Sequence, residues 1–174
     1  DNLRFARDRA FLDVFGFAEH LAGKDFTTQP VDKGGSDWAY LGPTMAAARN
    51  RWNAPGRFVT ILGYEYTPGK TVREPPGDCC VLGRGGSWSE RPAATELKDL
   101  QALSRAAGCL VIPHVGGRTP KWDKVDFSPE TTPLVEIASM HGKFEAFAQA
   151  GLQRGYKLGF CGMSDGHYGK PGYD

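Results

Sequence analysis

The sequence is poor in cysteine, has almost no surplus of charge and contains no long apolar run. Its four cysteines comprise the adjacent pair Cys79 and Cys80 and two isolated residues, Cys109 and Cys161, in apolar stretches. This arrangement predicts small buried side chains and no disulfide framework. The apolar runs fall well short of the roughly 18 residues that a membrane helix needs, so we expect no membrane partner. The compartment stays open, with the cytoplasm favoured.

Charge and length set further bounds. Lys and Arg together number 21 and Asp and Glu number 20, which leaves a formal charge of +1. This balance provides no basic field for non-specific binding, so nucleic acid is not an expected partner. A length of 174 residues predicts one domain, residues 1–174. The 23 glycines and 12 prolines indicate short elements joined by many loops, where functional sites commonly lie.

Hydrophobic periodicity predicts an alternation of helices and strands. The expected helices cover residues 3–11, 41–52, 94–108 and 143–155. The expected strands cover residues 11–18, 57–66, 79–83, 109–113, 133–139 and 157–164. Because these strands are almost continuous apolar runs with helices between them, they favour a parallel α/β sheet, either a barrel or a doubly wound sheet. In such folds the chemistry gathers at the carboxyl ends of the strands.

All four histidines follow a predicted strand, and two carboxylates join them at the same edge of the sheet. Imidazole nitrogen and carboxylate oxygen are ligands for Zn²⁺, Mn²⁺ and Fe²⁺, and the two oxygens of a carboxylate can bridge two ions. Paired ions of this kind activate water and hold a phosphoryl oxygen, so hydrolysis needs no protein nucleophile. We therefore predict a divalent metal site, with more than one ion, built from six residues: His20, Glu65, His114, His141, Asp165 and His167.

Some of these positions keep two interpretations. A single histidine after a strand is more often a hydrogen-bonding residue than a ligand, and Asp165 also suits a turn or a helix cap. What favours a metal site is that all six candidate residues are predicted to lie at the same edge of the sheet. Glu19, adjacent to His20, is either a further ligand or a side chain that points elsewhere. Glu136, inside its predicted strand, is either a ligand or a buried partner of an arginine or lysine.

Four cations lie just past candidate ligands, where a phosphate group would need positive charge: Arg118, Lys121, Lys143 and Lys170. Of these, we predict Arg118 and Lys143 as substrate-binding residues. The alternative for each cation is a solvated place on the surface.

Five stretches carry a resemblance to a known family: FLDVFGFAEH, RFVTILGYEYT, CLVIPHVGG, PLVEIASMHGKFE and GFCGMSDGHYGKPG. In this order they resemble the PHP family, the polymerase and histidinol phosphatase superfamily of metal-dependent phosphoesterases, over nearly the whole chain. The resemblance implies a distorted seven-stranded β/α barrel, related to the TIM barrel, with two or three metal ions at the strand carboxyl ends. It makes Glu65 the bridging ligand. The other ligands then divide over three ions: His114 and His141, Asp165, and the pair His20 and His167.

The sequence also departs from the family pattern. Family members open with a His-x-His strand that supplies ligands, whereas this sequence starts at the helix that would follow it, and Glu19 stands where relatives have aspartate. It also stops just after the last motif. We therefore expect a partial domain that lacks the first strand and the closure of the barrel. The ion on Asp165 should bind more weakly, and the open sheet edge should favour self-association into a homo-oligomer.

The predicted function is hydrolysis of a small-molecule phosphate ester by metal-activated water. The alternative is a catalytically inactive or incomplete PHP-like fragment that acts as a binding or structural domain. A metal-dependent amide hydrolase or deaminase on a similar barrel is a third candidate. The metal prediction requires His114, His141 and Glu65 to lie close enough to share an ion.

Overall fold

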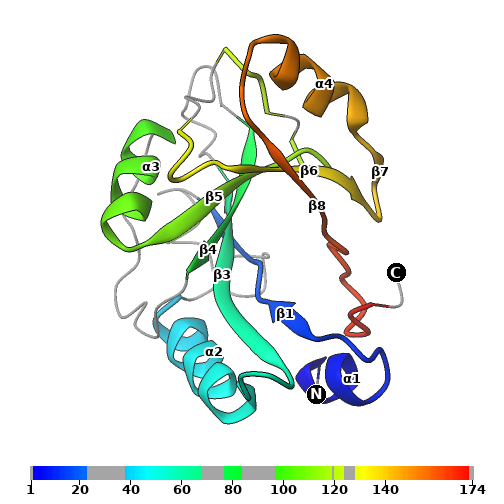
Figure 1. The fold of residues 1–174 in the computed structure, drawn as a ribbon. Coiled ribbons are helices and arrows are strands. Elements are labelled where there is room, and N and C mark those ends of the chain that lie inside the picture. The colour runs from blue at the N-terminus through cyan, green and yellow to red at the C-terminus, as the bar shows by residue number, and fades with distance from the viewer. Residues whose placement is uncertain are drawn as a thin grey trace.

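The computed structural model describes residues 2–22, 38–67, 77–83, 97–118, 120–123 and 128–172 (Figure 1). Its helices are α1 (Asn2–Asp8), α2 (Trp38–Trp52), α3 (Leu97–Ala106) and α4 (Glu145–Gln153). Its strands are β1 (Val14–Gly16), β2 (Glu19–Ala22), β3 (Val59–Thr67), β4 (Asp78–Gly83), β5 (Cys109–His114), β6 (Leu134–Ser139), β7 (Gly142–Lys143) and β8 (Gly159–Gly162). Each predicted helix and strand has a counterpart here, which confirms the mixed α/β class.

The described strands form two sheets, and no closed barrel is present among them. The larger sheet has the order β1-β3-β4-β5, with β2 also paired to β3, and the smaller has the order β7-β6-β8. β1 and β2 run parallel to β3, and β8 runs parallel to β6. The prediction of a parallel sheet is wrong at β4, which is antiparallel to β3 and β5. The connection from β3 to β4, residues 68–77, is shorter than the dozen or more residues that a parallel crossover takes.

The first predicted strand, 11–18, is shorter than expected and is followed by a second one. β1 pairs with Val59–Ile61, and β2 continues along the same side of β3 opposite Tyr64–Thr67. Glu19 and His20 therefore lie within a strand, not in a loop after one. The register places His20 directly opposite Glu65. Because opposite residues on neighbouring strands have adjacent side chains, this pairing brings two candidate ligands together.

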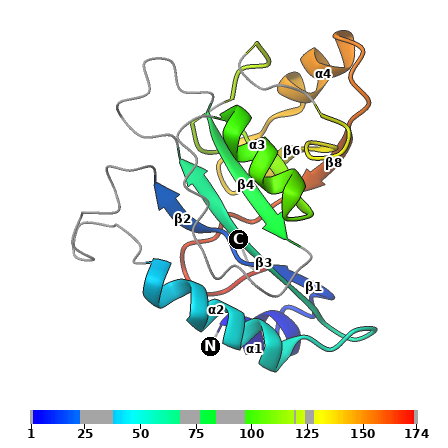
Figure 2. The same cartoon turned by 90° about the vertical axis from the view of Figure 1, so that its left-hand side faces the viewer.

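Helices cover the sheets and enclose the main core. α2 packs against β3 and α3 against β5, and Figure 2 shows both helices on the same side of the larger sheet. α4 packs against β6 of the smaller sheet. One cluster of buried residues spans both sheets and includes Tyr64, Leu100, Val111, Val135 and Ala148. The two sheets thus share a core, which fixes the strand ends relative to one another.

A second, smaller core fixes the first helix. Leu3 and Ala6, three positions apart on α1, are buried with Phe58 at the start of β3. Phe15 and Trp52 pack around them. None of the helices in the described ranges is long and apolar enough to cross a bilayer.

The cysteines are as predicted. All four are free; Cys79, Cys80 and Cys109 are buried and Cys161 is partly buried. Burial raises the pKa of each thiol, that of Cys161 to about 11. They are therefore protonated apolar side chains at neutral pH.

Candidate metal centre

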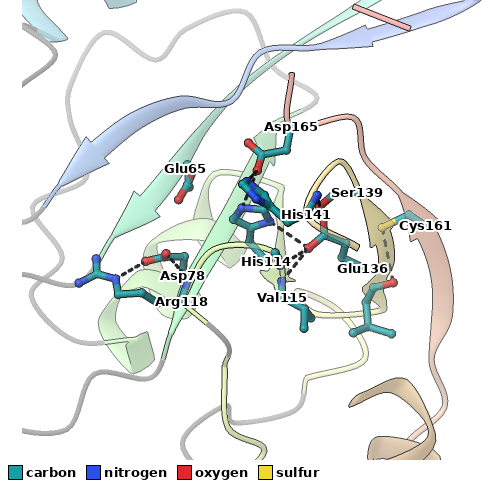
Figure 3. A network of polar contacts seen from close by, with 12 residues as sticks. Glu65, Asp78, His114, Val115, Arg118, Glu136, Ser139, His141, Cys161 and Asp165 are labelled. Atoms are coloured by element: carbon teal, nitrogen blue, oxygen red, sulfur yellow. Dashed lines mark hydrogen bonds and ion pairs between the residues drawn. The ribbon is translucent and has the colours of Figure 1, made fainter. Parts of the chain in front are cut away.

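Three segments far apart in the sequence converge on one point. Glu65 comes from β3, His114 ends β5, and Asp165 follows β8 (Figure 3). One ligand atom from each lies within 4.8 Å of the other two. Glu65 and His114 are buried and Asp165 is partly buried. Two carboxylates and an imidazole at this spacing can act together as ligands of one cation.

Asp165 links two histidines from different segments, His114 at the end of β5 and His141 in the turn between β6 and β7. Its Oδ2 lies 2.7 Å from Nε2 of His141 and 3.5 Å from Nε2 of His114. The backbone of Asp165 is left-handed, with φ of 51°, a conformation that aspartate tolerates better than most residues. The carbonyl oxygen of Asp165 lies 2.8 Å from Nδ1 of His167, which steadies the turn formed by S-D-G-H. The left-handed residue therefore aims its carboxylate at the two strand-end histidines.

Of the remaining two histidines, His20 lies beside Glu65, and His167 lies near His20. Nε2 of His20 is 3.3 Å from Oε2 of Glu65, as the register of β2 and β3 leads one to expect. The rings of His20 and His167 are 5.8 Å apart between centroids. The three residues that share mutual distances within 4.8 Å are Glu65, His114 and Asp165, and His141 reaches the group through Asp165.

Glu136 is fully buried in β6, and its partner is neither an arginine nor a lysine. Oε2 of Glu136 accepts hydrogen bonds from the backbone N–H groups of Val115 and Gly116, at 2.6 and 3.0 Å. The same oxygen lies 2.9 Å from Nδ1 of His114. Because Oε2 acts as the acceptor, we infer that His114 donates from Nδ1 and turns Nε2 toward Asp165. A carboxylate behind the ring in this way is the usual outer partner of a metal-binding histidine.

Charge in the site is unevenly balanced. Burial raises the pKa of Glu65; the nearby His20 and His114 oppose the rise, whereas Asp78 and Asp165 add to it. Burial alone would lower the pKa of His114, but the hydrogen bond and charge of Glu136, together with the charges of Glu65 and Asp165, outweigh it and raise that pKa. Buried carboxylates that repel one another are the electrostatic setting that a bound cation relieves. The donor chemistry and the charge thus both fit a divalent metal.

Two glycines after His114 let the chain pass close to the site. A Cβ atom built at Gly117 would lie 2.6 Å from Oδ2 of Asp78 and 2.8 Å from Cδ2 of His114. One built at Gly116 would lie 2.6 Å from the hydroxyl oxygen of Ser139. Sequence reasoning gave these positions no role, although two consecutive glycines, two and three residues after a candidate ligand, are a usable signal of close backbone approach.

The predicted phosphate-binding cations have different surroundings. Arg118 donates its backbone N–H and Nε–H to the buried carboxylate of Asp78, at 2.7 and 3.1 Å. Asp78, a residue that sequence reasoning missed, lies opposite His114 in the register of β4 and β5. Lys143 ends β7, is exposed and forms no ion pair within the part of the chain that the structure describes. Lys121 and Lys170 are also exposed.

Comparison with known proteins gives a structural relative but no sequence relative. No protein-family model and no curated protein matches the chain. The chain is similar to the crystal structure of a two-domain protein from Bacteroides vulgatus described as containing a predicted PHP-like metal-dependent phosphoesterase. The TM-score is 0.58 at 18% identity, over 95% of this chain and 47% of that chain. The chain thus spans about half the length of that protein, and the similarity shows a related fold.

Proposed function

We propose that this chain carries the metal-binding site of a PHP-family phosphoesterase that hydrolyses a small-molecule phosphate ester. The observation that carries the proposal is the convergence of Glu65, His114 and Asp165 from three separate segments, with ligand atoms within 4.8 Å of one another. The fold shared with a protein described as containing a predicted PHP-like metal-dependent phosphoesterase supports it.

The six candidate ligands divide by position. Glu65, His114 and Asp165 would hold one Zn²⁺, Mn²⁺ or Fe²⁺ ion, with His141 next to it through Asp165. The ring pair of His20 and His167, next to Glu65 through His20, would hold a further ion. When bound, such ions supply Lewis-acid polarisation of a phosphoryl oxygen and lower the pKa of water.

The protein's own groups prepare the site for that chemistry. Glu136 keeps the Nδ1 proton of His114 engaged, so that Nε2 offers its lone pair to the centre. Asp78 fixes the direction of the Arg118 side chain near the end of β5, where the guanidinium would orient a phosphate ester. Lys143 would add a second positive charge on the side of β6 and β7.

We also propose that residues 1–174 form one barrel-like domain. The shared core of the two sheets supports this, since one cluster of buried residues joins β3, β5 and β6. Within the described residues β1 and β8 each pair with a single strand. Unpaired strand edges favour pairing with another copy, so we expect self-association, measurable as mass by light scattering over a concentration series.

Metal analysis and a hydrolysis assay test the function directly. Chelator-treated protein is titrated with Mn²⁺ or Zn²⁺ by calorimetry and assayed with p-nitrophenyl phosphate. We expect metal-dependent hydrolysis that falls about 100-fold or more in Asp165→Asn, since outer partners of ligands alone contribute about 10–100-fold. Asp99→Asn, on an exposed position of α3, is the matched control and should leave hydrolysis unchanged.

The possible outcomes separate the candidate functions. Wild-type protein that binds neither ion and hydrolyses no ester would overturn the proposal. Metal binding without hydrolysis of any ester would favour the non-catalytic binding or structural domain. Hydrolysis of amides in preference to phosphate esters would assign the third candidate class.

A further inference from the structure

A pocket outside the candidate metal centre lies between α1 and the segment after His167. Its volume is about 640 Å³, within the size range of small-molecule sites. Its walls include six side chains: Arg4, Phe5, Asp8, Arg9, Tyr168 and Lys170. None of the six candidate metal ligands lines it. The pocket is therefore a separate site, and its occupant does not depend on the proposed function.

Close packing holds the two walls of the pocket together. A Cβ atom at Gly169, where φ is +69°, would lie 3.2 Å from Oδ1 of Asn2 at the start of α1. One at Gly172, where φ is +86°, would lie 2.9 Å from Cβ of Ala10. Both positions need the freedom of glycine, because a left-handed backbone is strained for most residues. Figure 1 shows the C-terminal segment running alongside α1.

The wall contributed by the first helix presents one face. Arg4 and Asp8, and likewise Phe5 and Arg9, are four positions apart and so lie on the same side of the helix. The opposite side, with Leu3, is buried in the small core. The charged and aromatic side chains are therefore displayed by a helix that is itself anchored.

The charge in the pocket is strongly positive for a chain whose formal charge is only +1. Arg9 and Lys170 share the pocket with one carboxylate, Asp8, and that carboxylate already pairs with Arg7 outside the pocket at 2.6 Å. Arg9 and Lys170 form no ion pair within the described residues. Cations gathered at one place repel one another unless an anion is shared between them.

We propose that this pocket binds a small phosphorylated molecule that carries a planar ring. A phosphate dianion offers three acceptor oxygens, which can bind the guanidinium group of Arg9 and the ammonium group of Lys170 together. Tyr168 is 74% exposed, which leaves its ring face open for stacking, and Phe5 supplies a second aromatic surface. The cationic side chains would bind the phosphate group, and the rings of Phe5 and Tyr168 would contact the planar ring of the ligand.

Binding to metal-free protein tests this site apart from the metal centre. Calorimetry in the presence of a chelator compares phenyl phosphate, inorganic phosphate and phenol. We expect phenyl phosphate to bind about tenfold more tightly than inorganic phosphate, because stacking adds to the ionic contacts. Phenol should not bind measurably. Loss of phosphate binding on chelation would overturn the proposal, since the anion would then require a metal.

Matched variants locate the binding. Arg9→Gln with Lys170→Gln removes two pocket charges and should weaken phenyl phosphate binding at least tenfold. Arg154→Gln with Lys157→Gln removes the same charges from exposed positions beyond α4, and it should leave binding unchanged. Equal weakening in both double variants would overturn the proposal, because binding would then follow overall charge.

A third variant tests the ring contact without removing charge. Tyr168→Ala should bring the affinities for phenyl phosphate and inorganic phosphate close together, and the high exposure of the side chain makes misfolding unexpected. An unchanged preference for the aromatic ester would overturn the stacking assignment. Circular dichroism and thermal unfolding verify that each variant is folded.

Discussion

The candidate metal centre has a buried half and an exposed half. Glu65 and His114 are 4% and 2% exposed and sit on β3 and β5, which both pair with β4 in the larger sheet. The side chains of His20 and His141 are 52% and 45% exposed. His114 is held from behind by the buried carboxylate of Glu136, whereas His20 and His141 reach the buried ligands through ion pairs with Glu65 and Asp165. This contrast predicts that metal affinity resides in the buried half.

The largest expected effect compares one histidine from each half. His114→Ala should lower metal affinity more than about 100-fold, because it removes a fixed ligand. It also leaves the buried carboxylate of Glu136 without the hydrogen bond from His114. His167→Ala, on an exposed residue, should lower it less than about tenfold. Calorimetric titration with Mn²⁺ measures both. Similar losses in the two variants would break the distinction between the halves.

Adding metal should raise the stability of the folded chain, and removing it should lower that stability. An ion that binds only the folded chain stabilises it by about 2.7 kcal/mol at 100 times its dissociation constant. For a chain of this length that corresponds to a rise in Tm of about 5–10 °C. Differential scanning calorimetry with and without Mn²⁺ measures the shift, and a chelator should reverse it. No shift at saturating metal would contradict a preformed site.

Glu136→Gln sharpens the comparison inside the buried half. The amide keeps the shape but weakens the acceptor behind His114, so we expect metal affinity to fall about 10–100-fold. Glu130→Gln, on a side chain that is 75% exposed and paired with Arg105, is the matched control. If metal affinity in Glu136→Gln equals that of the wild type, Glu136 has no positioning role.

Gly117→Ala should have the smallest effect, on stability. The added methyl group would meet Asp78 and His114 at under 3 Å, which we expect to cost about 1–2 kcal/mol of unfolding free energy. Gly162→Ala is the control, because its Cβ would meet only a carbonyl oxygen at 3.8 Å. Urea denaturation compares the two, and equal stability would show that the loop after His114 moves aside easily.

Much of the fold and of the candidate site can be predicted from the sequence, because the ends of strands are marked by the points where apolar runs stop. The apolar runs before His114 and Asp165 mark β5, which is buried, and β8, which is only partly buried. A polar residue that follows such a run lies near the end of a strand. That rule predicted that all six candidate ligands lie at one edge, and it singled out His114, His141 and Glu65 as the residues that share an ion. In the structure the trio with ligand atoms within 4.8 Å is Glu65, His114 and Asp165. The rule needs only the spacing of apolar residues within a short segment, which is a local property of the sequence.

What the sequence could not supply depends on contacts between distant segments. An apolar run such as Asp78–Gly83 reads the same whether its strand is parallel or antiparallel, so its direction was mispredicted. The partner of Glu136 is set by the packing of β6 beside β5, which no pattern within either strand encodes. The pairing of Asp78 with Arg118 spans 40 positions and has the same origin.

Because Asp165 has a positive φ of 51°, substitutions at this position can separate the effect of backbone conformation from the effect of the carboxylate charge. Asparagine and glycine accept a left-handed backbone, so either would preserve the loop while deleting the negative charge. Glutamate would preserve the charge but must adopt a backbone that it disfavours. Variants at this position should therefore fall into two groups. One group folds but does not bind the cation, and the other keeps the negative charge in a less stable loop.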